Sequence, residues 1–127
     1  MIVDTSAVLA VLFREEGAAH FARRIVTAPR CRLSVANLLE ASIVVGSRGG
    51  STDADLDLFV EESGIELMPV TLEQVAAARR AWRRFGKGRH PAALNFGDCF
   101  AYALATSTDE PLLFKGEDFA RTDVTRA

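Results

Sequence analysis

The chain has 127 residues, a hydrophobic content of 49% and a formal net charge of −2. This length is enough for a hydrophobic core, so residues 1–127 are expected to form a single domain. The near-neutral charge excludes a general electrostatic attraction to nucleic acid or membrane, so polyanion binding would need a local basic patch. No segment reaches the roughly 18 apolar residues of a membrane span, and Cys31 and Cys99 form no disulfide framework. These features favour a reducing, cytoplasmic setting and no membrane partner.

The first half of the sequence alternates short apolar segments with helical patterns. The expected elements are a strand at 2–3, a helix at 7–13, a helix at 18–27, a strand at 31–33, a helix at 35–47 and a helix at 52–63. Within the helix at 35–47, the apolar residues Val35, Leu38, Leu39 and Ile43 recur at helical spacing.

The second half continues the alternation and ends in a polar tail. The expected elements are a strand at 65–68, a helix at 72–85, a helix at 96–106 and a strand at 112–114. In the helix at 72–85, Val75, Ala78, Trp82 and Phe85 recur at steps of three and four, which predicts that they form its buried face. Trp82 is therefore assigned to the core and not to a base-stacking surface. Strands that alternate with helices indicate a three-layer α/β/α sandwich around a parallel sheet.

Four acidic residues lie where a chain that only builds a core would not place charge. Asp4 ends the first strand, Glu40 lies within an apolar helix, Asp98 lies in the first turn of the helix at 96–106, and Asp118 follows the last strand. Open α/β sheets bind ligands at the carboxyl ends of their strands, so these side chains are expected to converge. Grouped carboxylates repel one another unless a cation neutralises them. Mg²⁺ or Mn²⁺ prefers such oxygen ligands, and a cation with open water positions is suited to phosphodiester cleavage.

Each acidic residue also has a purely structural explanation. Asp4 fits an N-cap of the first helix, and Asp98 fits a capping arrangement with Asn95. Glu40 could pair with a basic side chain, and Asp118 could be an ordinary turn residue. Both explanations stay open for each residue alone, and it is the presence of all four that favours a metal site.

Four segments follow one another along the whole chain. They are Met1-Ile2-Val3-Asp4-Thr5-Ser6, Glu40 after Ser34-Val35-Ala36-Asn37, Asn95-Phe96-Gly97-Asp98-Cys99, and Leu112-Leu113-Phe114-Lys115-Gly116-Glu117-Asp118-Phe119. In order and spacing they resemble the PIN-domain family and, more narrowly, the VapC toxins of bacterial toxin–antitoxin pairs. The resemblance implies an endoribonuclease that needs Mg²⁺ or Mn²⁺ and acts on structured RNA such as tRNA or rRNA. It also implies a homodimer and a cognate VapB antitoxin whose C-terminal segment occupies the active site.

The resemblance also assigns roles to individual residues. The four acids match the family's quartet of catalytic residues and metal ligands, which here are Asp4, Glu40, Asp98 and Asp118. Ser6 matches a catalytic-site hydroxyl beside the first acid, and Asn95 matches a polar residue that precedes the third. Asp123 matches a supporting acid found in some members.

One dense group of basic residues is the candidate for a local polyanion-binding patch. Its members are Arg79, Arg80, Arg83, Arg84, Lys87 and Arg89. Such a patch would hold RNA phosphates and make binding salt-dependent, but a solvated helix face explains the same residues equally well. From this group Arg83, Arg84, Lys87 and Arg89 are taken, with Asn95, as candidate substrate-binding residues.

Two other functions stay open from the sequence. A different metal-dependent phosphohydrolase would use the same carboxylates on small phosphate esters. A non-catalytic binding module on the same fold would retain the acids only to engage a basic segment of a partner.

Overall fold

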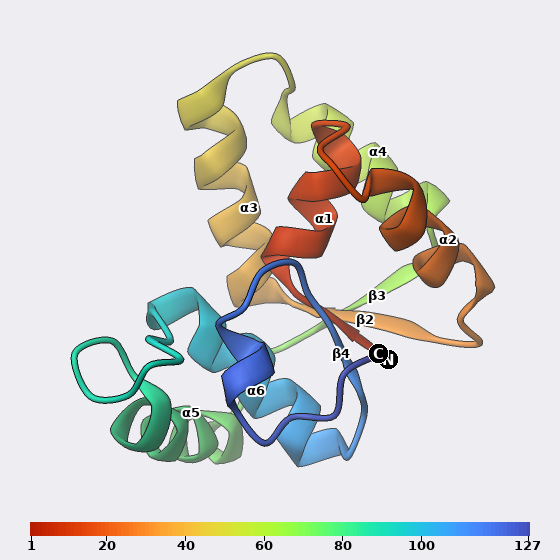
Figure 1. Ribbon diagram of the computed structural model, residues 1–127. Coiled ribbons are helices and arrows are strands. Elements are labelled where there is room, and N and C mark those ends of the chain that lie inside the picture. The colour runs from red at the N-terminus through yellow and green to blue at the C-terminus, as the bar shows by residue number, and fades with distance from the viewer.

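The computed structural model describes residues 1–127 and contains a four-stranded sheet with helices on both faces (Figure 1). The strands are β1 (Ile2–Val3), β2 (Cys31–Ser34), β3 (Ile65–Met68) and β4 (Leu112–Leu113), in the order β3-β2-β1-β4. Every pair is parallel, and Ile2 of β1 pairs with Arg32 on one side and with Leu112 on the other. The predicted three-layer α/β/α sandwich is therefore confirmed.

Six α-helices and one short 3₁₀ helix surround the sheet. They are α1 (Thr5–Leu12), α2 (Ala18–Thr27), α3 (Val35–Arg48), α4 (Asp53–Glu62), α5 (Leu72–Phe85), α6 (Phe96–Thr108) and η1 (Phe119–Arg121). Helices α1 to α4 lie on one side of the sheet, and α5 and α6 lie on the other (Figure 1). No helix is long and apolar enough to cross a membrane.

The two faces of β1 carry the two halves of the core. Val3 packs into the cluster with α1 to α4, and Ile2 packs into the cluster with α5 and α6. Neither side chain is exposed, as expected for a central strand whose successive residues point to opposite faces. The strand order reverses beside β1, because β2 and β3 lie on one side of it and β4 on the other. Ligand sites of open α/β sheets form at such switch points, and Asp4 follows β1 directly.

Helix α1 starts earlier than predicted because a side chain caps it. The helix begins at Thr5, two residues before the predicted start, because the Asp4 carboxylate accepts a hydrogen bond from the Ser6 backbone N–H. Capping boxes with Thr52 and Asn95 as the N-cap residues likewise precede α4 and α6.

The predicted buried face of α5 is wrong for most of its residues. The buried residues of this helix are Gln74, Ala77, Ala81 and Phe85. Trp82 is 42% exposed, and Val75 and Ala78 are only half-buried. The reason is that α5 packs mainly on α6, with Ala81 and Phe85 in the shared core cluster. Phe85 is buried as predicted, whereas Val75, Ala78 and Trp82 lie along the edge of the contact, so Trp82 is not a core residue.

The apolar spacing in α3 does not mark its buried face either. Asn37, Ala41 and Val45 point inward, whereas Leu39 and Ile43 are more than half exposed. Val35 is also exposed, so an apolar stripe of Val35, Leu39 and Ile43 runs along the outside of the helix. Apolar side chains are common on protein surfaces, so spacing alone could not reveal which stripe of α3 meets the sheet.

Candidate functional site

A polar cavity of about 240 Å³ lies beside the ends of β1 and β4. Its lining residues are Asp4, Thr5, Ser6, Leu9, Glu40, Val44, Asn95, Asp98, Lys115, Asp118 and Phe119. We name this cavity the acidic hollow. It contains all four acidic residues singled out in the sequence, together with the candidate residues Ser6 and Asn95.

Four separate parts of the fold supply the carboxylates. Asp4 follows β1, Glu40 lies in the second turn of α3, Asp98 lies in the first turn of α6, and Asp118 directly precedes η1. Helix α6 also carries a glycine where it faces α3. A Cβ atom at Gly97 would lie 2.0 Å from Glu40 Oε1, so only glycine leaves room for this carboxylate.

Asp4 is both a helix cap and a buried acid of the hollow. Its Oδ2 accepts hydrogen bonds from the backbone N–H and the hydroxyl of Ser6, at 2.9 and 2.5 Å. Its Oδ1 is buried and has no hydrogen-bond partner. Burial raises the pKa of Asp4 to about 7, the Ser6 hydrogen bonds oppose this rise, and the charges of Asp98 and Glu40 add to it. An orphaned, buried carboxylate oxygen is costly unless it meets a proton or a cation.

Asp98 shows the same combination of roles. Its Oδ2 accepts a hydrogen bond from the Asn95 backbone N–H at 2.8 Å, and Asn95 Oδ1 accepts one from the Asp98 N–H at 2.9 Å. Burial raises the pKa of Asp98 to about 6, helped by the charges of Glu40 and Asp118 and opposed by the Asn95 hydrogen bond. The capping explanations of Asp4 and Asp98 are thus correct, yet they leave the second oxygen of each carboxylate without a protein donor.

Glu40 is held by neutral donors and not by a basic side chain. Its Oε2 accepts hydrogen bonds from the Thr5 hydroxyl and from Asn37 Nδ2, the latter at 3.2 Å. Asn37 Nδ2 also donates to the Gly97 carbonyl at 3.0 Å, which ties α3 to α6 beside the hollow. No ion pair involves Glu40, so the alternative of a basic partner is wrong.

Three further residues around the hollow were not predicted from the sequence. Thr5 and Asn37 support Glu40, and Lys115 lines the cavity. Asn37 lies one helical turn before Glu40, and this spacing could have indicated a contact. Thr5 follows Asp4 directly, but nothing in the sequence shows that its hydroxyl reaches α3.

The hollow fits a divalent cation. Asp4, Glu40 and Asp98 each direct one oxygen to the protein and leave the other without a protein donor. Lys115 is the only basic residue of the lining, and its Nζ donates to Glu15 at 2.6 Å. No three of these acids are placed to hold a metal ion by themselves, so water would have to supply the remaining ligands. That arrangement suits Mg²⁺, which takes one or two carboxylates and keeps several waters.

The candidate substrate-binding residues of the basic group lie outside the hollow. Arg83 lines a second cavity between α5 and α6, and Lys87 lies on the exposed loop that follows α5. The Arg89 guanidinium stacks on the Trp82 ring, 4.2 Å from its centroid. Arg84 forms an ion pair with Asp123.

Asp123 also lies outside the hollow. It accepts a hydrogen bond from the Tyr102 hydroxyl at 2.7 Å, in addition to its ion pair with Arg84. Both oxygens of this carboxylate therefore have protein partners, and Asp123 does not line the hollow.

Comparison with known proteins decides the family. Residues 1–124 match the PIN domain. The chain belongs to the PIN-domain family. Ribonuclease VapC28 of Mycobacterium tuberculosis is 49% identical to it over 129 residues, which cover 100% of this chain and 97% of that relative. The PIN domain recognised from the sequence, of the VapC type, is thereby confirmed.

Two solved structures share the fold of this chain. Mycobacterium tuberculosis VapC20, described as a sarcin–ricin loop cleaving toxin, superposes with a TM-score of 0.79 at 15% identity and covers 99% of this chain and 97% of its own. A toxin–antitoxin complex from Klebsiella pneumoniae gives a TM-score of 0.73 at 12% identity, over 99% of this chain and 95% of that chain. At these identities the likeness establishes the architecture alone.

Proposed function

We propose that this VapC-type PIN domain is a toxin endoribonuclease that cleaves structured RNA, such as tRNA or rRNA, at the acidic hollow. The observation that carries the proposal is the meeting of four carboxylates from distant segments, three of which keep one oxygen free of protein donors. The 49% identity to a ribonuclease over the whole chain supports the same activity.

The residues of the hollow divide into two proposed roles. Asp4 and Asp98 hold a divalent cation, Mg²⁺ or Mn²⁺, and Glu40 and Asp118 complete its surroundings or position the attacking water. Ser6 fixes the orientation of Asp4 through two hydrogen bonds. When bound, the cation acidifies water and neutralises charge on the phosphate. Water attacks the phosphorus and the bond to the 3′ oxygen breaks, so the expected products carry a 5′-phosphate and a 3′-hydroxyl.

A partner and an oligomeric state belong to the same proposal. We expect a cognate VapB-type antitoxin that blocks the hollow, and the toxin–antitoxin complex among the structural neighbours supports such a partner. We also expect a homodimer, which the exposed apolar stripe of Val35, Leu39 and Ile43 on α3 supports as a contact surface. Two unpaired, buried cysteines are compatible with a cytoplasmic site of action.

The decisive experiment compares carboxylate variants that keep their capping role. Asp98→Asn and Asp4→Asn retain a side-chain oxygen for the cap but lose the charge that a cation needs. We expect cleavage to fall by about a thousand-fold, because charge stabilisation by a metal is worth several kcal/mol and each ~1.4 kcal/mol is a factor of ten. Sequencing the ends of total RNA, incubated with the purified protein and Mg²⁺ or EDTA, measures this.

A matched control is available in the capping box of α4. Asp55→Asn makes the same chemical change at an exposed cap outside the hollow, and it should cleave like the wild type. Cleavage at the wild-type rate by both hollow variants would contradict the proposal. Mg²⁺-dependent hydrolysis of small phosphate esters without RNA cleavage would indicate the other phosphohydrolase, and absence of saturable Mn²⁺ binding in calorimetry would indicate a binding module.

A further inference from the structure

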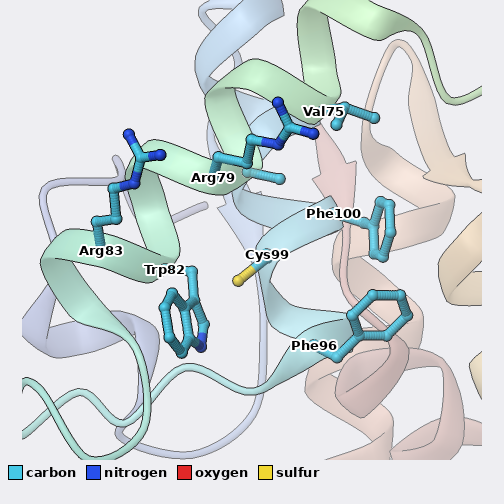
Figure 2. A pocket seen from close by; sticks show the side chains of 8 residues that line it. Val75, Arg79, Trp82, Arg83, Phe96, Cys99 and Phe100 are labelled. Atoms are coloured by element: carbon cyan, nitrogen blue, oxygen red, sulfur yellow. The ribbon is translucent and has the colours of Figure 1, made fainter.

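A second and larger cavity lies between α5 and α6 and has a different chemistry. Its volume is about 490 Å³, and its lining residues are Val75, Ala78, Arg79, Trp82, Arg83, Phe96, Cys99 and Phe100. We name it the aromatic groove. Figure 2 shows the Trp82 indole of α5 and the Phe96 and Phe100 rings of α6 on opposite sides of the Cys99 sulfur.

The groove borders the acidic hollow. Phe96 follows Asn95, and Cys99 follows Asp98, so the first turn of α6 lines the groove on one flank and the hollow on the other. A ligand that reaches the hollow can therefore continue into the groove around a single helical turn. This continuity makes the groove a candidate extension of the proposed RNA site.

The aromatic side chains of the groove are exposed yet held in place. Phe96 is 81% exposed and Trp82 is 42% exposed, so neither ring serves the core. The Phe96 ring meets Phe100 edge-on with centroids 4.9 Å apart, and the Arg89 guanidinium covers one face of Trp82. Large exposed rings that are fixed by neighbours are a ready surface for stacking a flat ligand.

The charge around the groove favours an anionic occupant. Arg79 and Arg83 line it, and neither forms an ion pair within the chain. Cys99 is buried between the rings, so this wall of the groove is apolar. A second copy docked here would bring the same arginines against each other, whereas a phosphate backbone would neutralise them.

We propose that the aromatic groove binds an unpaired RNA base next to the phosphate that is cut in the acidic hollow. The base stacks against Phe96 and Trp82, and Arg79 and Arg83 contact the adjoining phosphates. Single-stranded nucleic acid is bound in this way, by aromatic platforms beside basic side chains. The inference rests on the proposed RNA cleavage and adds the subsite that selects an unstacked nucleotide.

Trp82 is the only tryptophan, so its fluorescence reports directly on the groove. The experiment titrates the full chain, in EDTA to prevent cleavage, with a short oligoadenylate and with an abasic ribose-phosphate oligomer of the same length. We expect oligoadenylate to quench Trp82 and the abasic oligomer to leave it nearly unchanged. Quenching of equal size by both would overturn the proposal, since charge alone would then explain binding.

Phe96→Ala tests the stacking without removing the reporter. At 81% exposure this side chain can be truncated without opening the core, and oligoadenylate affinity should fall at least about five-fold. Phe96→Tyr should retain the affinity, and Val26→Ala, which removes an exposed apolar side chain on α2, should also bind like the wild type.

Two further outcomes separate this inference from the proposed function. If the wild type cleaves RNA but Phe96→Ala binds and cleaves normally, the groove proposal fails and the ribonuclease stands. If Phe96→Ala instead converts a dimer to a monomer in sedimentation while its RNA affinity is unchanged, the groove is a protein interface. If oligoadenylate quenches Trp82 specifically but the protein cleaves no RNA with Mg²⁺, the groove proposal stands and the ribonuclease proposal fails.

Discussion

The acidic hollow and the aromatic groove lie on two flanks of one helical turn but are stabilised in opposite ways. The hollow collects carboxylates from β1, α3, α6 and the segment after β4, and burial holds the pKa of Asp4 near 7. The groove is built by two consecutive helices around the buried Cys99. The buried negative charge of the hollow is therefore costly unless a cation neutralises it. The groove instead exposes apolar surface against which a ligand ring can stack. Neighbouring residues of the first turn of α6 can thus serve two sites, with Asp98 at the proposed metal site and Phe96 at the proposed base-stacking site.

Gly97→Ala should disrupt the hollow and leave the groove intact. Of the changes considered, it should have the largest effect and separate the two sites most clearly. The new Cβ would lie 2.0 Å from Glu40 Oε1 and 2.5 Å from Oε2, so the carboxylate must leave its place. We expect RNA cleavage to fall by about a hundred-fold or more, as for the loss of a positioned charged group. Oligoadenylate quenching of Trp82 should persist, because Gly97 does not line the groove.

Gly46→Ala is the matched control for this change. Gly46 also lies within a helix, α3, but a Cβ there meets no atom within 4 Å. Its cleavage should equal that of the wild type, and the stability of the helix should rise by roughly 0.5–1 kcal/mol. If Gly97→Ala cleaves as well as Gly46→Ala, the position of Glu40 does not matter for catalysis.

The second prediction concerns the unfolding of the cation-free protein as a function of pH. The pKa of Asp4 is raised from 3.8 to about 7 in the folded state, so its charged form opposes folding. This contribution to stability is complete below the ordinary aspartate pKa and is lost as the pH rises through about 7. Between about pH 5.5 and about pH 8 the wild type in EDTA should lose about 2 kcal/mol of unfolding free energy through this group.

Asp4→Asn cannot ionise, so it should remove most of this pH dependence, leave the smaller part due to the raised pKa of Asp98, and melt several degrees above the wild type at about pH 8. Thermal unfolding followed by circular dichroism measures both proteins, and Mn²⁺ should stabilise the wild type more than the variant. The matched Asp55→Asn should keep the wild-type profile, because Asp55 is exposed in its capping box. A steep profile retained by Asp4→Asn would show that Asp4 is not the strained acid of the hollow.

The alternation of strands and helices and the positions of the four acids were predictable from local sequence. Asp4 and Asp98 stand beside residues that end a strand or begin a helix, so the geometry of the nearest turn brings them to the carboxyl edge of the sheet. The predicted β-strands and the convergence of these acids therefore followed from short-range patterns and from the rule for parallel sheets.

The features that escaped prediction depend on contacts between distant segments. The hydroxyl of Thr5 reaches Glu40 across 35 positions, and Asn37 reaches Gly97 across 60. The predicted orientation of α5 is wrong because Ala77 and Ala81 are buried beside Phe85, whereas Val75 and Trp82 are not. Helical periodicity shows that a stripe exists, but the packing partner determines which stripe is buried, and so Trp82 was wrongly assigned to the core.

The smallest expected effect distinguishes two adjacent arginines that the sequence could not separate. Arg83 lines the groove without an ion-pair partner, whereas Arg84 is engaged by Asp123 and lies 4.5 Å from the Phe85 ring centroid. Arg83→Gln should weaken oligoadenylate binding a few-fold and reduce the slope of log affinity against log salt by about 0.7, the value for one phosphate contact on a single strand. Arg84→Gln should leave that slope unchanged, because its charge is already neutralised by Asp123.

Fluorescence titration of Trp82 at several salt concentrations measures both variants, with Arg23→Gln on α2 as the control for loss of an exposed positive charge. Equal loss of slope in all three variants would mean that RNA responds to net charge and not to the groove.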